Sequence, residues 1–206
     1  MKTKSGFTHL ALAMMLIAIF LFLNKPVNAQ QESPAPEPAY VPSLYFGLGL
    51  GINDYGFGAC LEAPIIDKLS FYGNAGLGGW GWKLGAGISF YPSKFPDKSS
   101  LSIGYSSGAG MKDFETVLTV EPDDVSEKVI LNLNRVGTVN LIYSYNFIVG
   151  SKGKFSLSAG YAIPVTTNPY EVVTPGITLT QTSMMVMDMM QPGGVILGFK
   201  FLFGVD

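Results

Sequence analysis

Apolar residues alternate with small or polar residues over many short stretches of this chain. Between Leu44 and Ile52, every second side chain is apolar, and Tyr45 and three glycines occupy the positions between them. Asn53-Asp54, a turn signal, separates this stretch from a second one with the same alternation. Because a β-strand turns successive side chains to opposite faces, the pattern predicts a hairpin of two strands with one apolar face.

The same alternation recurs downstream and predicts eight strands in all. A tilted strand crosses a bilayer with about 9 to 11 residues, and each stretch is about that long. The predicted strands are 44–52, 55–63, 69–77, 82–90, 101–109, 139–147, 155–163 and 195–203. Since an even number of strands returns both chain ends to one side, we predict an all-β fold, an eight-stranded antiparallel up-and-down transmembrane β-barrel.

The connections between these strands alternate in length. We expect the short ones (66–68, 92–99 and 149–153) to face the periplasm and the two long ones (111–135 and 166–192) to lie outside. The first long connection is acidic, and we expect a solvated loop, with a divalent cation bridging its carboxylates as the weaker alternative. Its stretches 116–120 and 129–133 alternate and could extend the fifth and sixth strands above the membrane.

The composition of the two strand faces separates a membrane barrel from a soluble one of the lipocalin sort. A water-facing surface should be rich in charged residues, but only 14% of the chain is charged and the second face holds mostly small residues. We therefore expect the apolar face to meet lipid and the glycines to make room in the lumen for larger side chains. Aromatic residues near strand ends are predicted to form two interfacial girdles, with Tyr55, Phe57, Trp80, Trp82 and Tyr161 outside and Phe46, Phe71, Phe90, Phe147, Phe155 and Phe203 inside.

The amino-terminal residues have the pattern of an export signal. Lys2 and Lys4 precede an apolar run of 14 residues, and the small-residue site Val27-Asn28-Ala29 follows. A helix needs roughly 20 residues to span a bilayer, so an uncleaved anchor is the weaker alternative. We predict a cleaved signal peptide (1–29), a Pro-rich periplasmic linker (30–42) and a transmembrane β-barrel (43–206).

The last predicted strand, Gly194 to Phe203, reads GVILGFKFLF. It is similar to the aromatic closing strand of small outer-membrane barrels, and the region 43–203 resembles the OmpA-like transmembrane barrels of Gram-negative bacteria in architecture. The resemblance implies a place in the bacterial outer membrane. It does not imply one activity, because that family includes enzymes, adhesins and structural anchors.

The residue inventory argues against catalysis. The one histidine, His9, lies in the predicted signal peptide, which excludes histidine-dependent catalysis and histidine metal sites from the mature chain. Glu62 is the one carboxylate expected in a strand on the lumen face, so no acid pair is predicted. Acidic residues outnumber basic ones by 15 to 13, which is unlike a nucleic-acid binder. We expect no enzyme activity, no cofactor, no metal and no nucleic-acid partner.

Three charged residues are predicted to point into the lumen as an ion-pair network: Glu62, Lys83 and Lys200. They could simply fill the interior, or they could gate a narrow ion path. Cys60 is expected on the same face, as a small buried residue rather than a reactive thiol.

The second long connection holds a cluster of methionines: Met184, Met185, Met187, Met189 and Met190. We expect 177–190 to form an apolar hairpin or strand extension that either folds over the barrel mouth or contacts a partner, and cuprous-ion binding is the weaker alternative. The predicted function is a non-catalytic structural or interaction role in the outer membrane, for example that of an accessory subunit in a larger surface or transport complex. Its partners would be outer-membrane lipid and another outer-membrane protein. The alternative is a small barrel that passes ions or apolar molecules.

Overall fold

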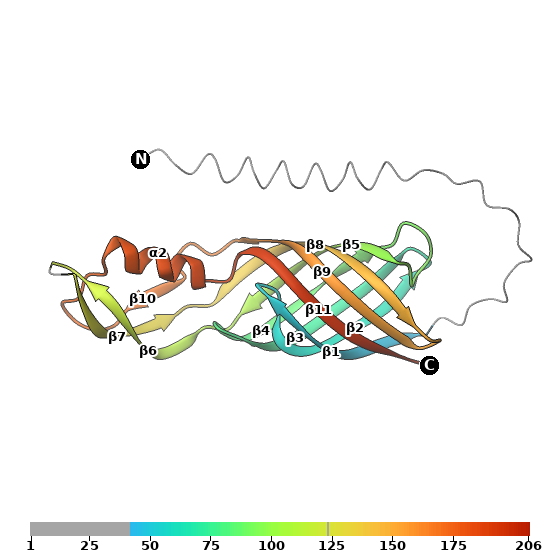
Figure 1. The fold of residues 1–206 in the computed structure, drawn as a ribbon, viewed down its shortest axis with the longest axis horizontal. Coiled ribbons are helices and arrows are strands. Elements are labelled where there is room, and N and C mark those ends of the chain that lie inside the picture. The colour runs from blue at the N-terminus through green and yellow to red at the C-terminus, as the bar shows by residue number, and fades with distance from the viewer. Residues whose placement is uncertain (1–41, 123) are drawn as a thin grey trace, which may run out of the picture. The chain divides into compact units, whose positions relative to one another are not determined.

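The computed structural model describes residues 42–122 and 124–206. The predicted signal peptide, and the predicted linker apart from Pro42, lie outside the described residues. Eight strands close into a barrel (Figure 1). They are β1 (Leu44–Ile52), β2 (Gly56–Ile66), β3 (Leu69–Gly78), β4 (Gly81–Phe90), β5 (Ser99–Gly108), β8 (Val136–Val149), β9 (Gly153–Pro164) and β11 (Gly194–Val205).

Each barrel strand pairs antiparallel with the strand before and after it around the barrel. The order is β1-β11-β9-β8-β5-β4-β3-β2, and the pairing of Leu44 with Val205 through Ile52 with Leu197 closes the ring. The predicted eight-stranded antiparallel barrel is therefore confirmed. Each strand covers most of its predicted range, because the alternation that predicted it is the alternation between the two faces of the barrel wall.

The two ends of the barrel differ in what they carry. One end, which we call the terminal end, holds the short connections β2–β3, β4–β5 and β8–β9 and both ends of the barrel region, where the Ser43 hydroxyl donates to the Val205 carbonyl at 3.2 Å. The opposite end holds the turns β1–β2 and β3–β4 and both long connections. We call the described residues of those long connections, 109–122, 124–135 and 165–193, the extension.

The extension is a folded unit and not a solvated loop, which corrects the expectation for 111–135. Strands β6 (Met111–Val120), β7 (Val125–Leu133) and β10 (Tyr170–Val172) form a separate sheet in the order β10-β7-β6. The predicted stretches 116–120 and 129–133 are indeed strands, but in this second sheet. Leu118, Leu131 and their neighbours are buried, which gives the segment the apolar core that a solvated loop lacks.

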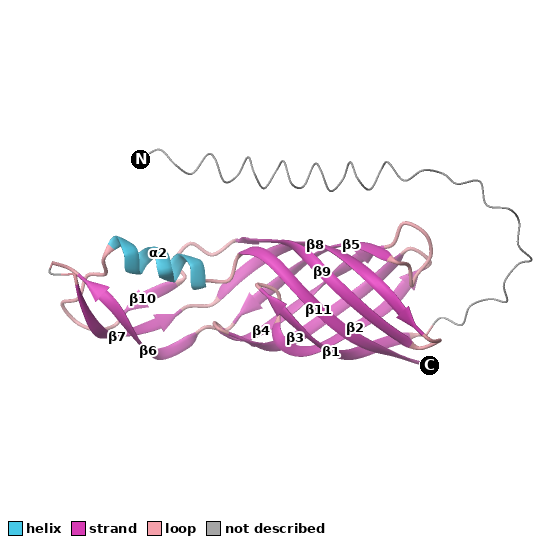
Figure 2. Cartoon of the chain, viewed as in Figure 1, coloured by secondary structure: helices cyan, strands magenta, loops and turns pink. Residues whose placement is uncertain are grey.

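Helix α2 (Gln181–Met190) replaces the hairpin or strand extension expected at 177–190 (Figure 2). Thr180 caps it, since its hydroxyl accepts a hydrogen bond from the Ser183 amide at 3.3 Å. Methionine favours helices, and Ser183 and Met187 turn inward one helical turn apart. Met187 belongs to the same buried cluster as Trp80 and Leu131, so the helix is anchored on one face of the second sheet.

The barrel wall is apolar outside and polar inside. Large apolar side chains from every barrel strand are exposed on its outer face, including Leu48 (59%) and Trp82 (62%). Serines, asparagines and charged residues are buried inside. The predicted girdles need one correction, because Tyr55 and Trp80 are buried, Tyr55 within the lumen and Trp80 in the extension core.

Candidate functional site

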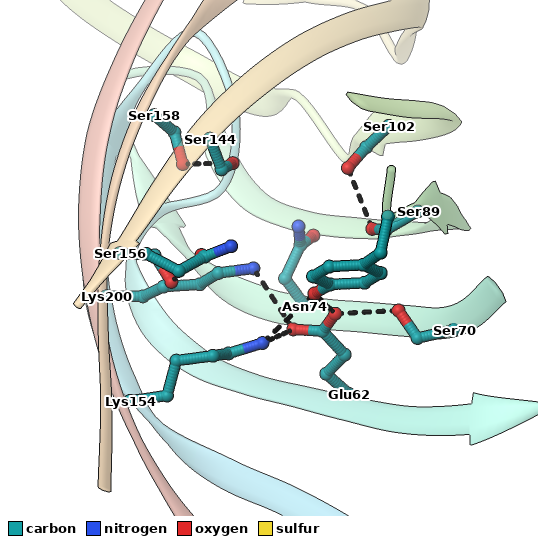
Figure 3. A network of polar contacts seen from close by, with 12 residues as sticks. Glu62, Ser70, Asn74, Ser89, Ser102, Ser144, Lys154, Ser156, Ser158 and Lys200 are labelled. Carbon is teal, nitrogen blue, oxygen red and sulfur yellow. Dashed lines mark hydrogen bonds and ion pairs between the residues drawn. The ribbon is translucent and has the colours of Figure 1, made fainter. Parts of the chain in front are cut away.

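A buried carboxylate organises the polar interior near the terminal end (Figure 3). Glu62 on β2 is 1% exposed and accepts hydrogen bonds from the Ser70 hydroxyl at 2.7 Å, the Tyr91 hydroxyl and the Lys154 ammonium. The Lys200 ammonium lies 3.8 Å from the same carboxylate. Because a buried charge is tolerated only when it is paired and hydrogen-bonded, these contacts account for Glu62 in the interior.

The Lys154 ammonium is surrounded by aromatic rings as well. It lies 5.1 Å from the ring centre of Phe95, 5.2 Å from that of Tyr45 and 5.6 Å from that of Tyr91. Its side chain is fully buried on β9. Ring faces attract cations, most strongly where water is excluded, so this cage stabilises a charge that Glu62 already pairs.

The β4–β5 connection supplies two of these rings and is hydrogen-bonded to the β2–β3 turn at the terminal end. The Tyr91 amide donates to the Lys68 carbonyl at 2.9 Å, and the Phe95 amide donates to the Asp67 carbonyl at 2.7 Å. Both side chains are buried. Burial and the Glu62 carboxylate hold the pKa of Tyr91 well above its usual value, so its hydroxyl stays protonated as a donor.

A second group of charged residues, Lys83 and Asp54, lies toward the other end. The Lys83 ammonium donates to the backbone carbonyl of Asn53 at 2.8 Å, and the side-chain amide of Asn74 donates to the Asp54 carboxylate at 3.4 Å. Burial raises the pKa of Asp54, while the Lys200 and Lys83 cations oppose that shift. Lys200 thus acts electrostatically on both Glu62 and Asp54.

The three predicted network residues are divided between these two groups. Glu62 and Lys200 come together, whereas Lys83 contacts the β1–β2 turn instead. Lys154, which hydrogen-bonds to Glu62, was missed because it falls between the expected connection 149–153 and the expected strand 155–163. Extending the alternation of Phe155, Leu157 and Ala159 back by one residue would have placed it on the lumen face.

Hydroxyl and amide pairs fill much of the remaining interior. Neighbouring strands contribute Ser89–Ser102 at 2.7 Å, Ser106–Thr138 at 2.8 Å and Ser144–Ser158 at 2.9 Å. Glycines make room for larger lumen side chains, as expected: Tyr55 and Tyr72 fill the space beside several of them, and Lys200 lies beside Gly49. A Cβ at Gly104 would lie 2.1 Å from the Tyr72 hydroxyl. A cavity of about 20 Å³ near Cys60, Asn74 and Lys200 has room for about one water molecule.

The extension carries the methionine cluster on α2. Met187 is buried, while Met184, Met185, Met189 and Met190 are exposed, Met189 by 82%. The cluster therefore divides between one anchor and four residues on the helix surface. No group of His, Cys, Asp or Glu among the described residues is arranged to hold a metal ion, and no helix in 42–122 or 124–206 is long and apolar enough to cross a membrane.

Neither sequence comparison identifies a relative. No protein-family model matches the chain, and no curated protein matches it significantly.

Proposed function

We propose that this chain is a non-catalytic integral protein of the bacterial outer membrane, a small OmpA-like barrel with a structural or interaction role. The observation that carries the proposal is the reversed polarity of the barrel wall. Burying one large apolar side chain is worth about 1.5 to 3 kcal/mol, and such side chains cover the outer face. Exposing these side chains to water would forgo that free energy, whereas a hydrocarbon environment would not. The predicted export signal agrees with a location in the outer membrane.

The filled interior favours an interaction role over transport. Between the Tyr91 and Phe95 side chains at the terminal end and Lys83 toward the other, charged and hydroxyl side chains form hydrogen bonds inside the lumen. An eight-stranded barrel is only just wide enough for its own side chains. The folded extension, in contrast, presents surface that the barrel does not need in order to close.

A charge placed on the outer wall tests the membrane location. Leu48→Arg puts a cation at the middle of β1 on the apolar face, and Val117→Arg is a matched control, since Val117 is 66% exposed on the extension. In a bilayer, arginine near the midplane costs about 2 to 4 kcal/mol. We expect Leu48→Arg to reduce the folded fraction in phosphatidylcholine vesicles, and Val117→Arg to leave it unchanged.

The readout is the migration of unboiled and boiled samples after refolding with vesicles, together with flotation of the vesicles. A barrel embedded in lipid floats and stays compact until boiled. If the chain folds without vesicles or detergent, and Leu48→Arg has no more effect than Val117→Arg, the membrane proposal is wrong.

A further inference from the structure

Helix α2 presents an apolar surface on the side away from its anchor. Ser183 and Met187 point into the extension core, and the opposite side exposes Met185 (56%) and Met189 (82%). Met184, Val186 and Met190 are exposed at its borders. We call these five residues the methionine face. Methionine adapts to irregular apolar surfaces, so such a face suits contact with an apolar partner segment.

The extension around this face is strongly acidic. Residues 109–135 and 165–193 hold eight acidic residues against three basic ones, and α2 contains neither lysine nor arginine. Asp188 lies on the exposed side of α2. Burial, and to a smaller extent the Asp188 carboxylate, raises the pKa of Tyr170 on β10.

Further carboxylates lie near the amino-terminal end of the helix. The amide of Glu121 donates to the Thr178 carbonyl at 2.9 Å, which places Glu121 beside the segment that leads into α2. Strand alternation puts Glu127 on the same sheet face as Val129 and Leu131, the face that α2 covers. The methionine face is therefore an apolar surface with acidic surroundings.

These charges decide which occupant fits. A second copy would bring the same excess of carboxylates against the first, and anionic lipid headgroups would be repelled in the same way. A protein segment that combines apolar with basic side chains satisfies both the methionines and the carboxylates. We propose that the methionine face is the docking surface for such a basic, apolar segment of a partner protein. The inference rests on the proposed function, because it takes the extension to lie outside the bilayer.

Selection from a random library tests the chemistry without a known partner. The probe is a library of random 12-residue peptides, panned against the folded full chain in a nonionic detergent after depletion on empty micelles. We expect the selected peptides to be enriched in Lys or Arg together with Leu, Ile or Phe, and their binding to weaken at least tenfold between low salt and 0.5 M salt.

Matched variants assign the binding to the helix. Met185→Gln with Met189→Gln should weaken the selected peptides at least tenfold, whereas Val117→Gln, an equally exposed position on the other sheet face, should change binding less than twofold. Asp188→Asn should weaken binding more than Glu171→Gln, whose side chain alternates away from the α2 side. Selection of acidic peptides, no enrichment, or peptides that bind the double variant equally well would overturn the proposal.

Heat-dependent migration of each variant on gels shows separately whether the barrel is folded. A folded barrel that floats with vesicles and selects no basic, apolar peptide contradicts the docking surface alone. A chain that does not enter vesicles contradicts the proposed function, whatever it binds.

Discussion

The Glu62–Lys154 pair joins β2 to β9 across the lumen, and each partner is buried almost completely. Removing one partner of a buried pair leaves an uncompensated charge, which costs about 3 to 5 kcal/mol. We therefore expect Lys154→Met to lower the free energy of unfolding by roughly this amount, measured by urea denaturation of the refolded protein. Lys200→Met should cost less, because Lys200 lies 3.8 Å from Glu62 and is partly exposed.

A double-mutant cycle separates the pair from its surroundings. Adding Glu62→Gln to Lys154→Met should recover part of the stability that Lys154→Met alone loses. In the double variant, neither position carries an unpaired charge. Additive effects of the two substitutions would contradict a direct coupling between these side chains.

Gly104 faces the lumen at a point where Tyr72 occupies the space of a side chain. A Cβ there would lie 2.1 Å from the Tyr72 hydroxyl and 2.6 Å from the Ala86 carbonyl oxygen. Overpacking of this kind typically costs about 1 to 3 kcal/mol, so we expect Gly104→Ala to destabilise the barrel in the same urea assay. Gly73→Ala is the control, because its Cβ would meet Leu61 at 3.4 Å, an ordinary contact. Equal effects of the two substitutions would contradict the proposed crowding.

At the scale of an element, α2 is held to the second sheet by Met187 and by Ser183, whose hydroxyl bonds to the Thr119 backbone. Met187 is fully buried in the cluster that includes Trp80 and Leu131, and truncating a buried methionine costs about 2 to 5 kcal/mol. We expect Met187→Ala to make the extension sensitive to limited proteolysis while the barrel keeps its heat-dependent migration. Met189→Ala, at a position 82% exposed, should change neither property. Loss of barrel folding in Met187→Ala would show that the extension does not open independently.

Strands were easier to predict than the extension for a physical reason. Leu44 to Ile52 alternates without interruption, because one side of the barrel wall is apolar and the other is crowded with small residues. In 181–190, Met185, Met187 and Met189 also repeat at every second position, which resembles a strand. The two buried residues, Ser183 and Met187, are four positions apart, which is the spacing of a helix. A sequence pattern that counts only apolar residues as buried does not show this, because Ser183 is polar.

The interior network could be predicted only in part. Alternation shows which residues face the lumen, as for Glu62, but not which strands bring their side chains to the same height. Lys83 and Lys154 both face inward, yet only Lys154 reaches Glu62. That height depends on the stagger between strands, which follows from the register of the whole ring.

At the scale of the whole molecule, the filled lumen leads us to expect that the barrel does not conduct ions. Transport requires a continuous path, but the Tyr91 and Phe95 side chains are buried together at the terminal end, and charged and hydroxyl groups bond to one another inside the barrel. We expect purified protein in planar bilayers to show no steady, solute-selective conductance at any salt concentration that leaves it folded. Tyr91→Ala with Phe95→Ala removes the two rings, and any conductance that appears only in this variant would locate the barrier in the β4–β5 connection. Steady currents through the unmodified protein would instead mean that the interior opens in the membrane, and would favour transport over the structural role.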